Sequence, residues 1–516
     1  MELWLLILLS ILSCAALSFL LLSPKSRNKL PPGPPAVPIL GNLIWLRNSI
    51  LDLEPVLRGL HRQYGPIVTL RIGSRLAIFI SDRNIAHKAL FEYGAAFSDR
   101  PVPLPASRFL SSNQHNVSSA AYGPLWRVLR RNLVSEILQP SRIKIYAPSR
   151  SWVLGVLYNH LRSQSRSSGG GVVVAMESFQ FAMFCLLVLM CFGEKLDERA
   201  IREIEVAHRN LLLYASSLNV LAFFPAVSKY VFRKRWNKAV ELAWKQTELC
   251  LPLIKARREH KKKKEEEYTE ERFVYSYLDS LLDIKLPEDG GRSLTEEEMV
   301  TLCAEFLNAG TDTTSTALQW IMAELVRHPG IQERLAGEIE GAVGKEGEAI
   351  REEDLQRVRY LKAVVLEGLR LHPPAHFVLP HKMSEEVEFE GYVIPKHATV
   401  NFMVAEMAWD GAVWEEPMEF RPERFLGGSG EPGKEVDITG SREIKMMPFG
   451  VGRRICPGLG LAVLHLEYFV ANLVRDFEWR AVEGEEVDMT EKSEFTVVMK
   501  NPLRAKLIPR RGIWES

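Results

Sequence analysis

One cysteine near the carboxyl end of the chain stands in a setting that can activate its sulfur. Cys456 lies in the glycine-rich segment FGVGRRICPG, residues 449–458. Glycine lets a backbone approach a ligand closely, and the apolar residues 459–474 predict a helix that begins just after Pro457. A helix N-terminus stabilises a thiolate, and Arg453 and Arg454 act in the same direction. Such a thiolate is suited to the axial position of a haem iron, whereas a plain buried cysteine is the alternative for this segment alone.

A second candidate for chemistry lies in the middle of a long apolar pattern. Thr295 and Glu298 form a capping box, and the helical pattern continues from there to residue 328. Asp312 and Thr313 place an acid beside an alcohol inside the run AGTDTT, residues 309–314, which is an arrangement suited to delivering protons during oxygen activation. A polar stripe on an amphipathic helix is the alternative. Gly310 costs a helix about 1 kcal/mol relative to alanine, so we expect close packing there.

Two further patterns combine charged side chains with helices. Glu367 and Arg370 are three residues apart, which puts opposite charges on one helical face, and Arg424 follows in the segment PERF, residues 422–425. Trp126 and Arg130 are four residues apart in a third helical segment. Alone, each pattern fits an ordinary surface helix, because most exposed ion pairs contribute little to stability.

Taken in order along the chain, these segments resemble the cytochrome P450 superfamily. The pattern Phe449-x-x-Gly452-x-Arg454-x-Cys456-x-Gly458 is similar to its haem-binding loop. The resemblance covers essentially the whole chain, from a Pro-rich segment after an apolar start to the cysteine loop. Residues 437–448 are most similar to the plant microsomal members of the A type, family eighty-nine in particular.

The resemblance implies roles for the residues in these segments. Haem b (iron protoporphyrin IX) would take Cys456 as the axial ligand of its iron, and Asp312 and Thr313 would serve oxygen activation. A structural cluster would hold the region behind the haem loop, and other side chains would meet the haem itself. The cluster would comprise Glu367, Arg370 and Arg424, and the further haem contacts Trp126, Arg130, Arg454 and His381.

His381 is a departure from the family pattern. Many members carry an arginine that binds a haem propionate after the proline that is Pro380 here. A histidine still donates a hydrogen bond, but its charge varies with pH.

The implied activity is haem-thiolate monooxygenation. It would insert one oxygen atom from O2 into a hydrophobic small molecule, with electrons from NADPH passed through NADPH–cytochrome P450 reductase. Lys445, Arg453 and Arg127 would give that reductase a basic docking face. By analogy with the family, the substrate pocket includes Asn308, Ala309, Phe377, Val378 and Phe495, with part of residues 103–120. Two alternatives remain, a haem-thiolate isomerase or dehydratase that does not use O2 and a non-catalytic haem-binding membrane protein.

Composition and length limit the architecture. The chain has 516 residues with 65 Lys plus Arg against 64 Asp plus Glu, which disfavours a nucleic-acid binder. Length alone favours three to four domains at about 150 residues each. The motifs from Trp126 to Cys456 instead predict one haem-binding catalytic domain, residues 38–516. We expect the cytochrome P450 fold, mainly α-helical with a small β portion: a hairpin near residues 67–80, helices from about 120 to 380, a Ser/Gly-rich loop at 163–171 and short strands near 382–402.

The amino terminus predicts a membrane anchor. Residues 3–22 are an uncharged apolar run long enough to cross a bilayer, and Lys25, Arg27 and Lys29 follow it. We therefore expect an anchor at residues 1–23, one N-terminal transmembrane helix, then a basic and Pro-rich hinge at 24–37. The catalytic domain would face the cytosol from a single-pass position in the endoplasmic reticulum membrane. In that topology the sequon at Asn116 would not be glycosylated.

Overall fold

The computed structural model describes residues 30–36, 42, 53–72, 75–215, 217–218, 230–266, 274–343, 350–426 and 436–510. The chain divides into two compact units. Unit 1 comprises Met1–Pro101 and Leu379–Met403, and unit 2 comprises Val102–Val378 and Val404–Ser516. The expected anchor at 1–23 lies outside the described residues, as does the expected hinge apart from residues 30–36. The single catalytic domain expected for 38–516 stays a prediction.

Unit 1 is built on a four-stranded sheet with the strand order β1-β2-β9-β6. The predicted hairpin is confirmed, since β1 and β2 are antiparallel with Ile67 opposite Ile80, and β9 lies parallel to β2. The strands expected near residues 382–402 are also present. The elements of this unit are α2 (Leu53–Tyr64), β1 (Ile67–Ile72), β2 (Arg75–Ile80), α3 (Arg83–His87), the π-helix η2 (Lys88–Glu92), β6 (His381–Lys382), β7 (Val387–Phe389), β8 (Tyr392–Ile394) and β9 (Thr399–Phe402).

Unit 2 is mainly helical, as predicted for this part of the chain. Its helices are α4 (Pro105–Leu110), α5 (Pro124–Leu133), η3 (Val134–Leu138), α6 (Pro140–Ile145), α7 (Ala147–Ser167), α8 (Ala175–Phe192), α9 (Glu198–Ala215), α11 (Arg233–Glu266), α12 (Tyr277–Asp283), η5 (Pro287–Asp289), α13 (Glu296–Arg327), α14 (Pro329–Val343), α15 (Glu352–Leu355), α16 (Arg359–Leu371), α17 (Val404–Ala408), η6 (Pro422–Phe425), η7 (Gly452–Arg454) and α18 (Leu459–Asp476). Its strands are β3 (Val172–Val174), β4 (Lys285–Leu286), β5 (Arg292–Ser293), β10 (Phe477–Arg480), β11 (Glu491–Ser493), β12 (Val497–Met499) and β13 (Arg504–Pro509).

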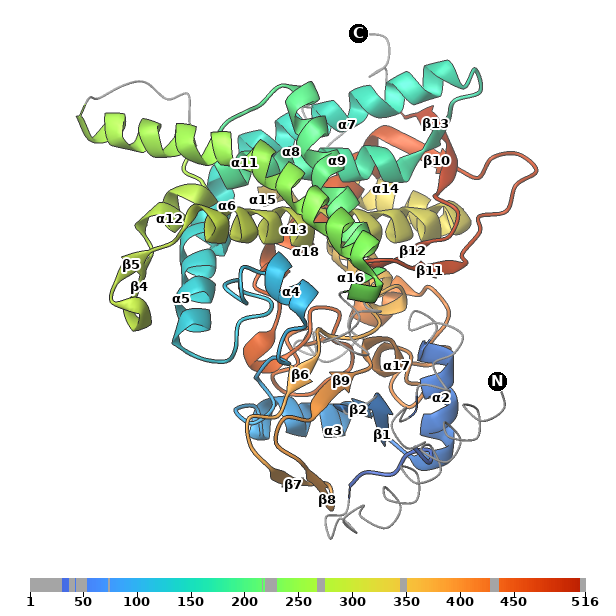
Figure 1. The fold of residues 1–516 in the computed structure, drawn as a ribbon. Helices are drawn as coiled ribbons and strands as arrows, with labels where there is room; N and C mark the ends of the chain where they lie inside the picture. The colour runs from blue at the N-terminus through green and yellow to red at the C-terminus, as the bar shows by residue number, and fades with distance from the viewer. Residues whose placement is uncertain are drawn as a thin grey trace, which may run out of the picture. The chain divides into compact units, whose positions relative to one another are not determined.

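Helix α13 runs through the middle of unit 2, among α8, α11, α16 and α18 (Figure 1). The capping box expected at Thr295 and Glu298 is present, and the helix ends at Arg327 with His328 as its C-cap. The close packing expected at Gly310 is also found, because a Cβ atom there would lie 2.7 Å from Cδ1 of Leu187 on α8. The glycine therefore allows the two helices to approach each other.

Helix α8 is uniformly apolar and belongs to the hydrophobic core of unit 2. Among the described residues it is the one helix that is long and apolar enough to cross a membrane, and 94% of it is buried inside the protein. A helix that is hydrophobic all round is expected where other elements surround it on every side.

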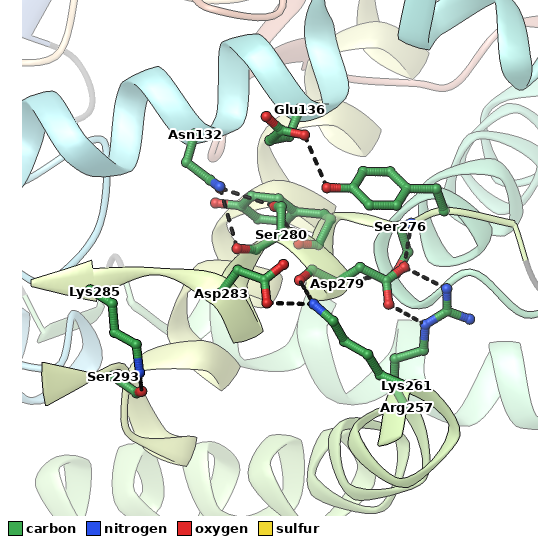
Figure 2. Close-up of polar contacts among 12 residues, drawn as sticks. Asn132, Glu136, Arg257, Lys261, Ser276, Asp279, Ser280, Asp283, Lys285 and Ser293 are labelled. Carbon is green, nitrogen blue, oxygen red and sulfur yellow. Dashed lines mark hydrogen bonds and ion pairs between the residues drawn. The ribbon is translucent and has the colours of Figure 1, made fainter. Parts of the chain in front are cut away.

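Helix α5, which carries Trp126 and Arg130, is fixed at its carboxyl end by polar contacts with α12. Asn132 Oδ1 accepts a hydrogen bond from Ser280 Oγ at 3.0 Å (Figure 2). Asp279 of the same short helix caps its N-terminus with Ser276 and accepts from Arg257 Nε of α11 at 2.7 Å. These contacts join α5, α11 and α12 around the buried ion pair of Arg257 and Asp279, which favours a single packing arrangement.

Candidate active site

The cysteine loop has the backbone that its glycines predict. Gly450 and Gly452 have φ angles of 64° and 73°, in the left-handed region that disfavours residues with a Cβ. The Cys456 N–H donates to the Phe449 carbonyl at 2.8 Å, which closes the loop. Helix α18 begins at Leu459, as predicted, with Gly458 at its N-cap. The Cys456 side chain is exposed, while the other cysteines of the described residues, Cys185, Cys191, Cys250 and Cys303, are buried.

The electrostatics of Cys456 differ from the sequence-based expectation. Surrounding protein raises the pKa of the Cys456 thiol above its ordinary value, although the Gly458 N–H and the charge of Arg130 act in the opposite direction. Cys456 lies two residues before the N-cap, and the N–H of that N-cap residue, Gly458, is the first group that favours its thiolate. Binding of a metal ion deprotonates a coordinating thiol directly, so an accessible thiol of this kind suits a metal-bound role.

Trp126 lies buried beside the cysteine loop, and two guanidinium groups lie close to its indole ring. Arg454 lies over the indole at 4.5 Å from its centroid and Arg130 at 5.5 Å, and Arg130 Nη2 donates to the Ile455 carbonyl at 2.6 Å. The indole Nε1 of Trp126 is buried and has no hydrogen-bond partner among the described residues. A buried donor without an acceptor is costly. One buried donor and two guanidinium groups fit the carboxylate groups of haem, so the residues present fit this cofactor.

Tyr122 is a neighbour of this group that the sequence did not indicate. Its hydroxyl accepts a hydrogen bond from Arg453 Nη1, and the Arg127 guanidinium lies 5.2 Å from the centroid of its ring. Burial alone would raise the pKa of Tyr122, but hydrogen bonds with Arg453 and Arg127 lower it overall. The guanidinium groups of Arg453 and Arg127 therefore both lie close to the Tyr122 side chain. Lys445, the third residue of the expected docking face, pairs with Glu443 at 3.2 Å.

Asp312 and Thr313 have separate partners. Thr313 Oγ1 donates to the Ala309 carbonyl at 2.6 Å, one turn earlier in α13. Asp312 accepts from Arg209 Nη1 of α9 at 2.8 Å and from Gln180 Nε2 of α8 at 3.3 Å. Burial raises the pKa of Asp312, and Arg209 and Gln180 partly offset that rise. Neither of these partners was predicted, because no local pattern in α8 or α9 marks them.

The three residues of the predicted structural cluster lie together. Glu367 and Arg370 are fully buried and form two hydrogen bonds, of 2.7 and 2.8 Å, and Arg424 Nε reaches Glu367 Oε1 at 3.3 Å. The Arg421 N–H donates to the same oxygen at 2.9 Å. Arg370 also lies 5.4 Å from the ring centroid of Trp414. The carboxylate therefore holds α16 against the segment around η6.

His381 belongs to unit 1, and the other predicted haem contacts belong to unit 2. Its ring is buried, and Nδ1 lies 2.5 Å from the Phe97 carbonyl oxygen. Because a carbonyl only accepts, Nδ1 carries the proton. Arg100 of the same unit donates to the carbonyls of Leu379 and Pro380 at 2.7 and 2.9 Å. The role of His381 toward haem stays a prediction.

The predicted substrate residues all belong to unit 2. Ala309 is exposed in the centre of α13, although most side chains around it are buried. Asn308 is half-buried and hydrogen-bonds to His208, whose pKa burial lowers to about 4. Phe377 and Val378 are half-buried. Phe495 lies in the turn between β11 and β12 and is 46% exposed.

Comparison with known proteins identifies the family. The family model of cytochrome P450 matches residues 31–509. Cytochrome P450 89A9 of Arabidopsis thaliana is 49% identical over 498 residues, 94% of this chain and 95% of the relative. Geraniol 8-hydroxylase of Swertia mussotii is 31% identical over 94% of this chain and 95% of its own. Flavonoid 3'-monooxygenase CYP75B137 of Crocosmia x crocosmiiflora is 32% identical over 93% and 92%.

The mainly helical fold and the matched model define a haem-thiolate protein. This chain belongs to the cytochrome P450 family, and its similarity to cytochrome P450 89A9 supports family 89. The relatives include plant monooxygenases, and the chain is a cytochrome P450 monooxygenase, an oxidoreductase that incorporates one atom of oxygen. The predicted family and enzyme class are confirmed.

Glu367→Ala should abolish haem incorporation. It leaves the Arg370 guanidinium buried without its carboxylate, a change that costs about 3–5 kcal/mol in buried pairs. Glu415→Ala is the matched control, because that carboxylate is 87% exposed. The measurement is the haem content per folded protein after purification. Full haem content in Glu367→Ala would contradict the structural role of the cluster.

Proposed function

We propose that this enzyme inserts one oxygen atom from O2 into a hydrophobic small molecule of plant metabolism. Haem b would be held by Cys456, and NADPH–cytochrome P450 reductase would supply the electrons. The observation that carries the proposal is the exposed Cys456 thiol beside a buried indole donor that lacks an acceptor. Both features are explained by one flat cofactor that accepts a thiolate on its metal and carries carboxylates at its edge.

In this proposal some side chains bind the cofactor and others hold protons for the reaction. The haem–thiolate group supplies the oxygen-activating chemistry when it is bound. Cys456 binds the iron, and Trp126, Arg130 and Arg454 donate to the propionates. Thr313 and Asp312 hold protons for the reaction, and Arg209 and Gln180 keep the Asp312 carboxylate oriented and connected to α9 and α8.

The residues proposed for the substrate pocket favour an apolar compound. Ala309, Phe377, Val378 and Phe495 present apolar surface, and Asn308 adds one amide. The names of two relatives specify geraniol and a flavonoid as substrates, both of them small organic molecules. We infer a substrate of similar size and polarity.

We also propose a location and a partner surface. An anchor at residues 1–23 would hold the enzyme in the endoplasmic reticulum membrane, facing the cytosol. The Asn116 side chain is buried and accepts a hydrogen bond from the Ser119 N–H at 3.1 Å, which agrees with an unglycosylated sequon. Arg127 and Arg453, both exposed, would form the centre of the surface that meets the reductase.

Product formation should require NADPH and O2. We expect that the holoenzyme with a plant P450 reductase, given a plant metabolite extract under labelled oxygen, yields products that carry one labelled oxygen atom. The measurement is mass spectrometry of extracts incubated with and without NADPH. Rearranged products that form without NADPH and carry no label would contradict the proposal and indicate an isomerase or dehydratase.

Asp312→Asn should slow turnover without loss of cofactor. Asparagine keeps a hydrogen-bonding group near Arg209 but cannot accept and release a proton, so we expect product formation to fall about a hundredfold or more. Asp283→Asn is the control, since its carboxylate is 67% exposed and pairs with Lys261. The measurement is the rate of labelled product per haem. A change below about twofold would contradict the proton-handling role of Asp312.

A further inference from the structure

The loop between α4 and α5 is fastened along one face of α13. We name residues 112–120 the tethered loop. Ser112 Oγ lies 2.6 Å from Thr301 Oγ1, and His115 Nδ1 bonds to the Glu298 carboxylate. Glu305 receives two consecutive backbone amides, with Val117 N–H donating to Oε2 at 2.8 Å and Ser118 N–H donating to Oε1 at 2.6 Å.

The helix residues that hold this loop continue toward the centre of the site. Glu298, Thr301 and Glu305 are spaced by three and four residues, so they share one face of α13. Four residues further along that face is Ala309, the exposed residue in the middle of the helix, and Thr313 follows after four more. Glu305 is therefore the last tether before the surface that we assign to substrate.

The backbone of the tethered loop is strained at its start. Ser112, Asn113 and Gln114 have φ angles of 45°, 61° and 66°, three successive non-glycine residues in the left-handed region. Residues with a Cβ adopt that region at a cost, and strained segments persist only where their surroundings fix them. Gln114 Nε2 donates to the Ser119 carbonyl at 2.7 Å, which closes the loop on itself.

The same stretch is also held from the cysteine loop. Arg454 Nη2 donates to the Ala120 carbonyl at 2.7 Å, and Nη1 donates to the Val117 carbonyl at 3.4 Å. The Glu305 carboxylate thus accepts hydrogen bonds from backbone N–H groups of this stretch, and the Arg454 guanidinium donates hydrogen bonds to its carbonyls. Hydrogen bonds in which one partner is ionised are about twice as strong as neutral ones, so both attachments are well suited to fix a strained loop.

We propose that Glu305 is a positioning residue that fixes the tethered loop beside the Ala309 face of α13 and so determines which compounds the enzyme accepts. The inference rests on the proposed function in one respect, the assignment of that face to substrate. Glu305 acts through the backbone of Val117 and Ser118. A glutamine at this position keeps one acceptor oxygen and loses the second one and the charge.

The experiment compares Glu305→Gln with the wild-type holoenzyme and with Glu297→Gln. Glu297 is on the same helix, and its side chain is exposed, so the control makes the same chemical change away from the loop amides. Hydrogen–deuterium exchange by mass spectrometry is read on peptides that cover residues 112–120. We expect exchange in Glu305→Gln to be at least about tenfold faster there, the change expected from the loss of one charge-assisted hydrogen bond. Exchange in α18 should be unchanged.

A second readout uses two azole probes, imidazole and 4-phenylimidazole, titrated by absorbance. Both bind the same cofactor, and the larger probe adds an apolar ring that the proposed pocket must accommodate. If the tethered loop lines that pocket, the ratio of their dissociation constants should change at least about threefold in Glu305→Gln. Faster exchange with an unchanged ratio would overturn the proposal, because it would indicate a merely structural tether. Unchanged exchange would also overturn it. If Glu305→Gln does not fold, Glu305→Asp is used, with smaller changes expected in the same directions.

These results are separable from the proposed function. A wild-type protein that binds neither azole would refute the proposed haem-thiolate site. The exchange measurement on residues 112–120 would still decide whether Glu305 holds the loop.

Discussion

The buried carboxylate of Glu367 is the interaction on which the arrangement of unit 2 around Cys456 depends most. It receives hydrogen bonds from Arg370, Arg424 and the Arg421 N–H. A carboxylate buried to this degree is tolerable only when every partner is in place. Arg370 connects this carboxylate to the cysteine loop through Trp414. The Arg370 guanidinium lies over the Trp414 ring, and Trp414 Nε1 donates to the Lys445 carbonyl at 3.2 Å. Lys445 begins the segment that leads into the cysteine loop, so the loop is held in place from α16.

Two sides of helix α13 make different contacts. On one side Asp312 turns to Arg209 and Gln180, which tie the acid to α9 and α8. On the face that includes Ala309 and Thr313, the helix is held to a loop by Glu305. The close approach of α8 at Gly310 fixes the helix between these two sides. A monooxygenase needs both a controlled source of protons and a substrate held in one orientation, and this helix supplies residues for each.

The sequence predicts those parts of the site that rest on local patterns. The cysteine loop, the start of α18 and the capping box of α13 each follow from residues within a few positions of one another, so they were predicted correctly. The Ser/Gly-rich residues 163–171 were expected to form a loop, but α7 continues to Ser167. In that last turn Ser167 Oγ donates to the Ser163 carbonyl at 2.6 Å. Serine is a weak helix former, but here its hydroxyl bonds to a carbonyl of the helix, and the helix does not end before it.

Partners that are distant in the sequence could not be predicted in this way. Arg209 is 103 positions from Asp312, and Glu305 is 188 positions from Val117. Each is an ordinary charged residue on an amphipathic helix, and only the packing of helices reveals its partner. The sequence also did not indicate that Arg130 is a charge that favours the Cys456 thiolate. The helix terminus was predicted, and the N–H of its N-cap residue Gly458 lowers the pKa of the thiol, but the surrounding protein raises that pKa overall.

We propose that Cys456 supplies the thiolate that binds haem iron. The most direct measurement is the carbon monoxide difference spectrum of the reduced, purified protein, recorded for the wild type and for Cys456→Ser. We expect the red-shifted band of a thiolate-ligated haem in the wild type and its loss in Cys456→Ser, since a serine oxygen does not replace the thiolate sulfur electronically. A folded wild-type protein that contains haem but never shows this band, or a Cys456→Ser protein that keeps it, would show that Cys456 does not supply the thiolate ligand.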